Sequence, residues 1–182
     1  MTADAPRVAP GTRRDVGLVN WGIAAALGRA AGTSPPNVFL TLGRHRGLFR
    51  GWLHFAGRLM PFGRLSRRET ELVILRVAYL AGCTYEQSHH RPLAIKAGVS
   101  PAEVDRVLTP AGDGGWSPRE RVILTTVDLL HEHRDLTDEQ WATLRQHLSE
   151  GEAIELLLLA GHYEMLATTI NTLRIPLDEP RG

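Results

Sequence analysis

Apolar residues recur along this chain at helical spacing, and the apolar stretches follow sequences typical of helix starts. Helix starts in which a Ser or Thr is followed three residues later by Glu or Gln stand at 66–69, 100–103, 117–120 and 137–140. In such a capping box the first side chain accepts a hydrogen bond from a backbone N–H group that the helix leaves unpaired, and the Glu or Gln side chain accepts one in return. No alternating apolar segment bounded by a hairpin turn competes with these signals. The pattern predicts an all-α protein.

The predicted helices cover residues 15–31, 36–59 (broken near Gly43 or Gly47), 67–81, 84–97, 101–108, 118–133, 138–147 and 150–173. Residues 1–14 are polar with scattered prolines and predict a flexible arm, and residues 176–182 predict a surface tail. A glycine-rich link is expected at 111–115. We therefore expect one helical domain over residues 15–175.

Two predicted helices are apolar on nearly every side. Only Glu71 and Arg76 interrupt the apolar character of residues 71–81, and residues 154–159 are similar. Such helices are buried inside a protein or between subunits. We therefore expect a homo-oligomer.

Composition and charge exclude several classes of protein. The 182 residues are 43% hydrophobic and 23% charged, as in ordinary globular proteins. Because 21 basic residues face 20 acidic ones without a basic cluster, nucleic-acid binding is disfavoured. A single cysteine rules out an intramolecular disulfide and any redox cycle that needs two thiols of one chain. Without a signal-like apolar stretch or a membrane-spanning run, we expect a cytoplasmic protein that does not associate with membranes.

The stretch at residues 83–90 carries the candidate chemistry. On a helix, Cys83, Glu86 and His90 fall within roughly 60° of one another. Glu86 and His90 are four residues apart and can touch, and a carboxylate beside histidine raises the imidazole pKa and orients the ring. Cys83 would lie at the helix start, where the helix dipole favours a thiolate. The spacing therefore predicts an acid–base pair beside a thiol.

Each of these residues also has a purely structural interpretation. Glu71, in an apolar helix, must find a partner or raise its pKa, and a salt bridge with an arginine such as Arg76 would satisfy it. Cys83 could be a small buried side chain, and His90 could make an interhelical hydrogen bond. Because the residues share one spacing pattern, the functional interpretation is favoured.

The spacing Glu71-x11-Cys83-x2-Glu86-x3-His90 resembles the carboxymuconolactone decarboxylase and alkylhydroperoxidase D (AhpD)-like superfamily. The resemblance runs over residues 65–108. It implies an all-α fold of helices in orthogonal and antiparallel packing, and usually trimers or hexamers.

This chain departs from the peroxidase-type members at one position. Those members carry a second cysteine where Glu86 stands, as the attacking thiol that the first cysteine resolves into a disulfide. The decarboxylase-type members resemble this chain at Glu86-x3-His90, and the resemblance implies acid–base machinery there. The sequence therefore looks intermediate between the two branches.

Other polar and aromatic residues have weaker claims. Predicted to line a pocket are Tyr85, His89, His162 and Tyr163. His131 and His133 diverge by about 200° on a helix, so an exposed helix end is favoured over a metal site.

The favoured hypothesis is an enzyme that acts by proton transfer on a small organic acid, lactone or related carbonyl compound. Glu86 and His90 would be the acid–base pair, Glu71 would tune them, and Cys83 and Tyr85 would shape the pocket. The hypothesis includes no cofactor and no metal, and the expected partner is a small-molecule substrate.

Three alternatives stay open. A one-cysteine peroxidase would oxidise Cys83 to a sulfenic acid, although a neighbouring Glu86 would raise the thiol pKa. A non-catalytic helical oligomer could bind a ligand, and a site closed to solvent would favour this. A metal site of Glu86, His90 and His162 is a minor alternative.

Overall fold

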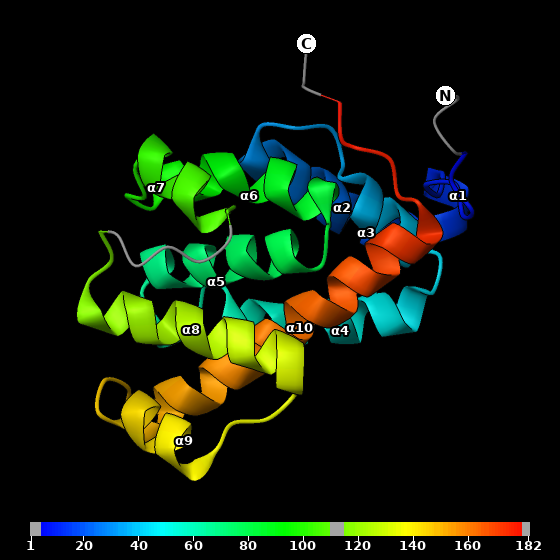
Figure 1. Ribbon diagram of the computed structural model, residues 1–182. Coiled ribbons are helices and arrows are strands. Elements are labelled where there is room, and N and C mark those ends of the chain that lie inside the picture. The colour runs from blue at the N-terminus through cyan, green and yellow to red at the C-terminus, as the bar shows by residue number, and fades with distance from the viewer. Residues whose placement is uncertain (1–4, 110–114, 180–182) are drawn as a thin grey trace. The chain divides into compact units, whose positions relative to one another are not determined.

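A computed structural model describes residues 5–109 and 115–179 (Figure 1). In these ranges the regular structure consists of α-helices without a β-strand, which confirms the all-α prediction. The helices are α1 Arg13–Val16, α2 Leu18–Ala31, α3 Asn37–Leu42, α4 Arg46–Leu59, α5 Arg67–Leu80, α6 Thr84–Lys96, α7 Pro101–Val107, α8 Pro118–His133, α9 Asp138–Arg145 and α10 Glu150–Leu173. The expected link at 111–115 lies mostly outside the described residues.

The chain divides into two compact units. Unit 1 takes the residues up to Ala56 together with those from Thr169 onward, and unit 2 runs from Gly57 to Thr168. The residues that carry the candidate chemistry all lie in unit 2. The expectation of one domain over residues 15–175 stays a prediction.

All four predicted capping boxes form. At α5, for example, Ser66 accepts a hydrogen bond from the Glu69 N–H group, and the Glu69 carboxylate accepts one from the Ser66 N–H group at 2.9 Å. The same exchange occurs at Ser149 and Glu152, where α10 begins. The helix boundaries of unit 2 are thus largely a local property of the sequence.

In unit 1 the first predicted helix is divided in two. Gly17 separates α1 from α2 and has a φ of 80°, a conformation that side chains with a Cβ rarely adopt. The predicted break near Gly43 is confirmed, because α3 ends at Leu42 and α4 begins at Arg46.

The segment preceding α1 makes hydrogen bonds within unit 1. The Arg7 N–H group donates to the Leu173 carbonyl at 2.9 Å, and the Arg44 guanidinium donates to the Ala9 carbonyl at 2.9 Å. These bonds attach part of the predicted arm to the unit.

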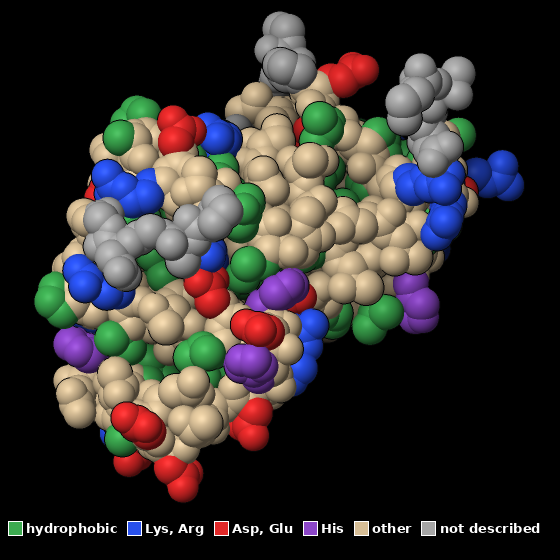
Figure 2. All heavy atoms as spheres, viewed as in Figure 1, with side chains coloured by type: hydrophobic (Ala, Val, Ile, Leu, Met, Phe, Trp, Pro, Cys, Tyr) green, Lys and Arg blue, Asp and Glu red, His purple; other side chains and the backbone are tan. Residues whose placement is uncertain are grey.

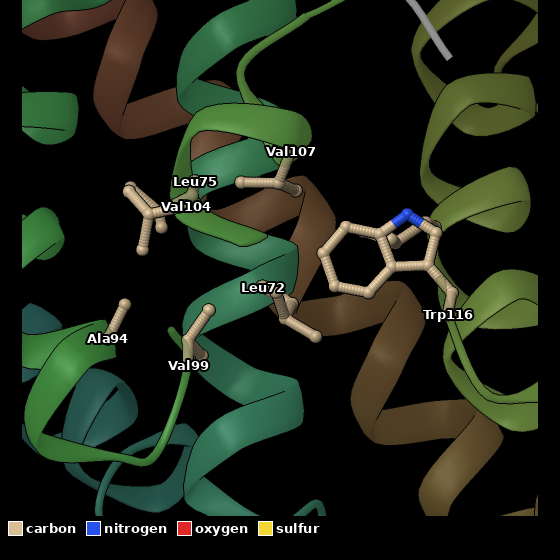
Figure 3. Packing of buried hydrophobic residues seen from close by; sticks show 8 residues of the cluster. Leu72, Leu75, Ala94, Val99, Val104, Val107 and Trp116 are labelled. Carbon is tan, nitrogen blue, oxygen red and sulfur yellow. The ribbon is translucent and has the colours of Figure 1, made fainter. Parts of the chain in front are cut away.

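In unit 2, α5 lies between α8 on one side and α6 with α7 on the other (Figure 1). Every residue of α5 from Glu69 to Ala78 is buried, as its nearly all-round apolar pattern predicts. Figure 3 shows the Trp116 indole facing Leu72 and Val107 in the hydrophobic cluster that α5 shares with α6, α7 and α8. The packing on both sides of α5 fixes the helix that carries Glu71.

An arginine at the start of α5 and one at the start of α8 each bind a carboxylate at the start of the other helix. Arg68 of α5 donates to Glu120 of the α8 capping box at 2.7 Å, and Arg119 of α8 donates to Glu69 of the α5 capping box at 2.6 Å. The two helices therefore begin side by side and run parallel.

The same two arginines reach the starts of two further helices. Arg68 also bonds Glu103 in the α7 capping box and the Gly98 carbonyl, while Arg119 bonds Glu152 at the start of α10 and the His147 carbonyl. Each carbonyl lies two residues before the serine that begins the box. The segments α5–α7 and α8–α10 thus repeat one pattern of contacts.

Among the described residues, α10 is long and apolar enough to cross a membrane by length and composition alone. Within the protein, 56% of its most apolar window is buried. Its Glu155 accepts a hydrogen bond from the Leu65 N–H group at 3.0 Å in unit 2. These contacts are those of a core helix.

Candidate functional site

Three side chains from two helices form a line in unit 2. Nδ1 of His90 lies 2.8 Å from Oε2 of Glu71, and Nε2 of His90 lies 3.3 Å from Oε2 of Glu86. Glu71 comes from α5, while Glu86 and His90 occupy successive turns of α6. All three side chains are buried. The imidazole is therefore held between two carboxylates.

This geometry fixes how many protons the cluster holds. A neutral imidazole has one donor and one acceptor nitrogen, whereas an ionised carboxylate can only accept. Since both ring nitrogens of His90 face carboxylate oxygens, the cluster is satisfied when His90 is an imidazolium or when one carboxyl group carries that extra proton. Burial lowers the pKa of His90, but hydrogen bonds and charges from Glu71 and Glu86 outweigh it and raise the pKa to about 9. His90 is thus the protonated member at neutral pH.

Arg67 extends the line outward. Its Nη2 atom lies 2.5 Å from Oε1 of Glu71, one turn further along α5. The sequence spacing is enough to predict this ion pair, because Arg67 and Glu71 are four residues apart on a helix. The suggested partner Arg76 is wrong. It points to α8, where it binds both oxygens of Asp128, and Glu71 takes Arg67 and His90 instead.

Cys83 differs from the expected reactive thiol. It occupies the position just before α6, yet it is completely buried. Burial, followed by the charge of Glu86, raises the pKa of the thiol to about 11, although the N–H groups of Glu86 and Tyr85 act in the opposite direction. The expectation that the helix start would favour a thiolate is wrong, because desolvation outweighs it.

α10 contributes aromatic side chains to the site. The Tyr163 ring lies edge-on to His90, with ring centroids 5.4 Å apart and an interplanar angle of 89°. Burial, then the charges of Glu86 and Glu71, raises the pKa of Tyr163 well above its ordinary value. His162 is also buried, and burial lowers its pKa. Both aromatic residues are therefore neutral beside the cluster at neutral pH.

The other two pocket candidates lie on α6 itself. The rings of Tyr85 and His89 stack with centroids 6.1 Å apart, and His89 is 5.8 Å from His90 by the same measure. Tyr85 is buried and His89 half-buried. The eight candidate residues thus lie on α5, on α10, on α6 or, for Cys83, directly before α6.

A pocket of about 690 Å³ lies elsewhere in unit 2, along α8, α9 and α10. None of the eight candidate residues lines it. One end holds His131, whose Nδ1 atom lies 2.5 Å from Oε1 of Glu164. Figure 2 shows histidine and acidic side chains gathered where α8 ends. The prediction of a merely exposed helix end is wrong for His131, which is half-buried and paired.

Within the described residues, no group of three or more His, Cys, Asp or Glu side chains is arranged to hold a metal ion. Glu86, His90 and His162 therefore do not form such a group.

Comparison with known proteins gives one match of sequence and several of structure. Residues 46–128 match the carboxymuconolactone decarboxylase family. By sequence, none of the curated proteins matches the chain.

Three solved structures show the same fold. An AhpD-core, peroxidase-related protein from Ralstonia eutropha JMP134 is 18% identical, with a TM-score of 0.83 over 94% of this chain and 93% of the other. A peroxidase-related protein from Silicibacter sp. TM1040 is 15% identical, with a TM-score of 0.82 over 97% and 90%. A cysteine-to-alanine variant of the debrominase Bmp8, in complex with 2,3,4-tribromopyrrole, is 18% identical, with a TM-score of 0.80 over 96% and 93%.

Proposed function

Because the chain belongs to the carboxymuconolactone decarboxylase and AhpD-like superfamily, we propose that it is an enzyme that moves protons on a small organic substrate. The observation that carries the proposal is the line of Glu71, His90 and Glu86, with 2.8 and 3.3 Å between its polar atoms. A histidine oriented by one carboxylate and adjacent to a second is suited to general acid–base catalysis.

The roles follow from the proton count. Glu71 holds Nδ1 of His90 and fixes the orientation of the ring. Glu86 accepts a proton from the substrate, which weakens its contact with Nε2 of His90, and the imidazolium then donates its Nε2 proton to the oxygen on which negative charge develops. A second transfer in the opposite direction restores both groups.

The substrate class is a small organic acid, lactone or related carbonyl compound. Such compounds have an acidic C–H bond beside a carbonyl group, and loss of that proton places charge on an oxygen that a cation can stabilise. The debrominase of the same fold was crystallised with a small ring compound, which agrees with a substrate of this size. Isomerisation of such compounds begins from this step, whereas decarboxylation reaches the same kind of charged oxygen by loss of CO2 and then needs a proton from the acid.

The peroxidase alternative is supported less well by the site. A one-cysteine peroxidase needs an accessible thiolate. Cys83 is completely buried, and its pKa is raised to about 11.

The non-catalytic alternative is favoured by one observation. Glu71, Glu86 and His90 are all buried, as the polar core of a structural or ligand-binding protein would be. In that case the cluster contributes to folding, and its loss lowers stability without a matching loss of turnover.

An exchange assay tests the proposed function without assuming one substrate. The protein is incubated in D2O with a panel of carboxylated lactones and 2-oxo acids, and ¹H NMR follows the loss of C–H signals beside the carbonyl. We expect wild type to catalyse the exchange and Glu86→Gln to lose this activity. Glu132→Gln, which changes an exposed carboxylate at the end of α8, should exchange as fast as wild type. Wild-type protein that exchanges no member of the panel, or Glu86→Gln with full exchange, would reject it.

We also infer a homo-oligomer, a trimer or hexamer, located in the cytoplasm. Support for assembly comes from large apolar side chains that are about half exposed on α10, namely Ile154, Leu158 and Met165.

A further inference from the structure

Arg67 links the buried cluster to solvent. Of the four residues in the line, its side chain alone is more than a third exposed, at 38%, whereas that of Glu71 is 0% exposed. The two oxygens of Glu71 are divided, since Oε1 lies against Arg67 and Oε2 against His90. The carboxylate that orients His90 is therefore itself held by a guanidinium.

The location of Arg67 is unfavourable for a cation unless it has this partner. It is the first residue of α5, directly after Ser66, which precedes the helix. The positive end of the helix dipole disfavours a cation there. Pairing with Glu71 offsets that cost, so the placement of Arg67 is explained by the carboxylate below it.

The charges of the cluster balance only when Arg67 is counted. Two ionised carboxylates and one imidazolium sum to minus one, and the guanidinium of Arg67 brings the sum to zero. An uncompensated buried charge is expensive, and such a site relieves it by binding a proton. Without Arg67, the group that would take up the proton is Glu71 or Glu86.

Other titratable groups also pack against the cluster, and on α6 the ring centroid of His89 lies 5.8 Å from that of His90. On α10, burial keeps Tyr163 and His162 neutral, and at the start of α6 burial keeps Cys83 a neutral thiol. Arginine does not lose its proton in the accessible pH range, so its charge is constant.

We propose that Arg67 is a positioning residue that holds the buried Glu71–His90–Glu86 cluster to one shared proton and so keeps Glu86 ionised as the proton acceptor. The proposal rests on the proposed function for its link to turnover. Its claim about the proton count stands on the geometry alone.

The experiment compares Arg67→Gln with wild type, because glutamine can still donate a hydrogen bond to Glu71 but carries no charge. Arg67→Lys restores the charge. The control is Arg91→Met, which removes an exposed arginine that pairs with Asp105 at the surface. Arg67→Met replaces Arg67→Gln if that variant does not fold. ¹³C NMR of the glutamate carboxyl groups and ¹⁵N NMR of the His90 ring count the protons at each pH.

In Arg67→Gln we expect a carboxyl group of the cluster to protonate at a pH higher by about 1–3 units than in wild type. The acidic limb of the proton-exchange rate should shift upward by the same amount. Arg67→Lys should restore most of the wild-type profile, and Arg91→Met should not change it.

Carboxyl titrations in Arg67→Gln or Arg67→Met that match those of wild type would overturn the proposal. A wild-type protein without exchange activity would reject the proposed function, whereas the NMR titrations would still decide the role of Arg67. Titrations that shift while the acidic limb of an active enzyme does not would also overturn it, because Glu86 would then not be the acceptor.

Discussion

The Nε2 atom of His90 lies 3.3 Å from a carboxylate oxygen of Glu86, one turn before it on α6. This contact is local in sequence, and it joins the two groups to which we assign the proton transfers.

Glu86→Gln and His90→Ala should each lower the proton-exchange rate by about 10²–10⁴-fold, because a positioned acid or base contributes on that scale. The double variant should lose less than the product of the two single losses, since the residues act as a unit. Rates measured per folded protein, with thermal unfolding of the same samples as the control, check this. Variants that unfold earlier but turn over normally when folded would assign the pair a structural role.

Cys83→Ser should retain most of the activity. The wild-type thiol should also react slowly with iodoacetamide at pH 8, because burial raises its pKa to about 11. Mass spectrometry of the alkylated protein and the exchange assay measure the two expectations. Rapid alkylation of folded protein, together with loss of turnover in Cys83→Ser, would favour the peroxidase alternative.

Stability should fall as the pH rises from 6.5 toward 9. The pKa of His90 is raised from 6.5 in the unfolded chain to about 9 in the folded one, so its contribution is complete below 6.5 and is lost as the pH passes through 9. Urea unfolding across this range should show the decline, and His90→Gln should reduce it. If the stability of His90→Gln fell equally steeply over this pH range, the decline would belong to other groups.

Replacing Arg68 or Arg119, which connect the starts of α5 and α8, should destabilise unit 2. Arg119→Met leaves the carboxylates of Glu69 and Glu152 without their partner, and loss of such a bond costs about 1–3 kcal/mol. A double-mutant cycle between Arg119 and Glu69 should give a coupling of about 0.5–3 kcal/mol. A cycle between Arg119 and the exposed Glu132 should give none. Additive effects for the first pair would show that the ion pair contributes little.

The exposed side of α10 should lie between subunits. Ile154, Leu158 and Met165 fall within about 40° of one another on the helix. Leu158→Glu should therefore weaken assembly, while Glu150→Gln, a change at an exposed carboxylate, should not. Light scattering at micromolar concentration measures both, and a monomeric wild type would contradict the inference.

The sequence predicts best the features that depend on near neighbours. The capping boxes at Ser66, Ser100, Ser117 and Thr137 lie within four residues, and all of them form. The contact of Glu86 with His90 follows in the same way from one helical turn.

Features that depend on tertiary packing were not predictable in the same way. Glu71 and His90 are nineteen residues apart, and only the packing of α5 on α6 decides that they meet. Burial likewise decides the state of Cys83, and no local pattern measures burial. Arg67 is an intermediate case, because its spacing from Glu71 is local but its importance depends on the depth of that carboxylate.

The contacts of Arg68 with Glu120 and of Arg119 with Glu69 have a consequence for how unit 2 folds. Each arginine completes the start of a helix in the opposite half, so a half of the repeat on its own would leave carboxylates of its helix starts without a cation. Neither half is then a self-sufficient module. Unit 2 should unfold in a single cooperative step, and its two halves, made as separate peptides, should become ordered only when mixed.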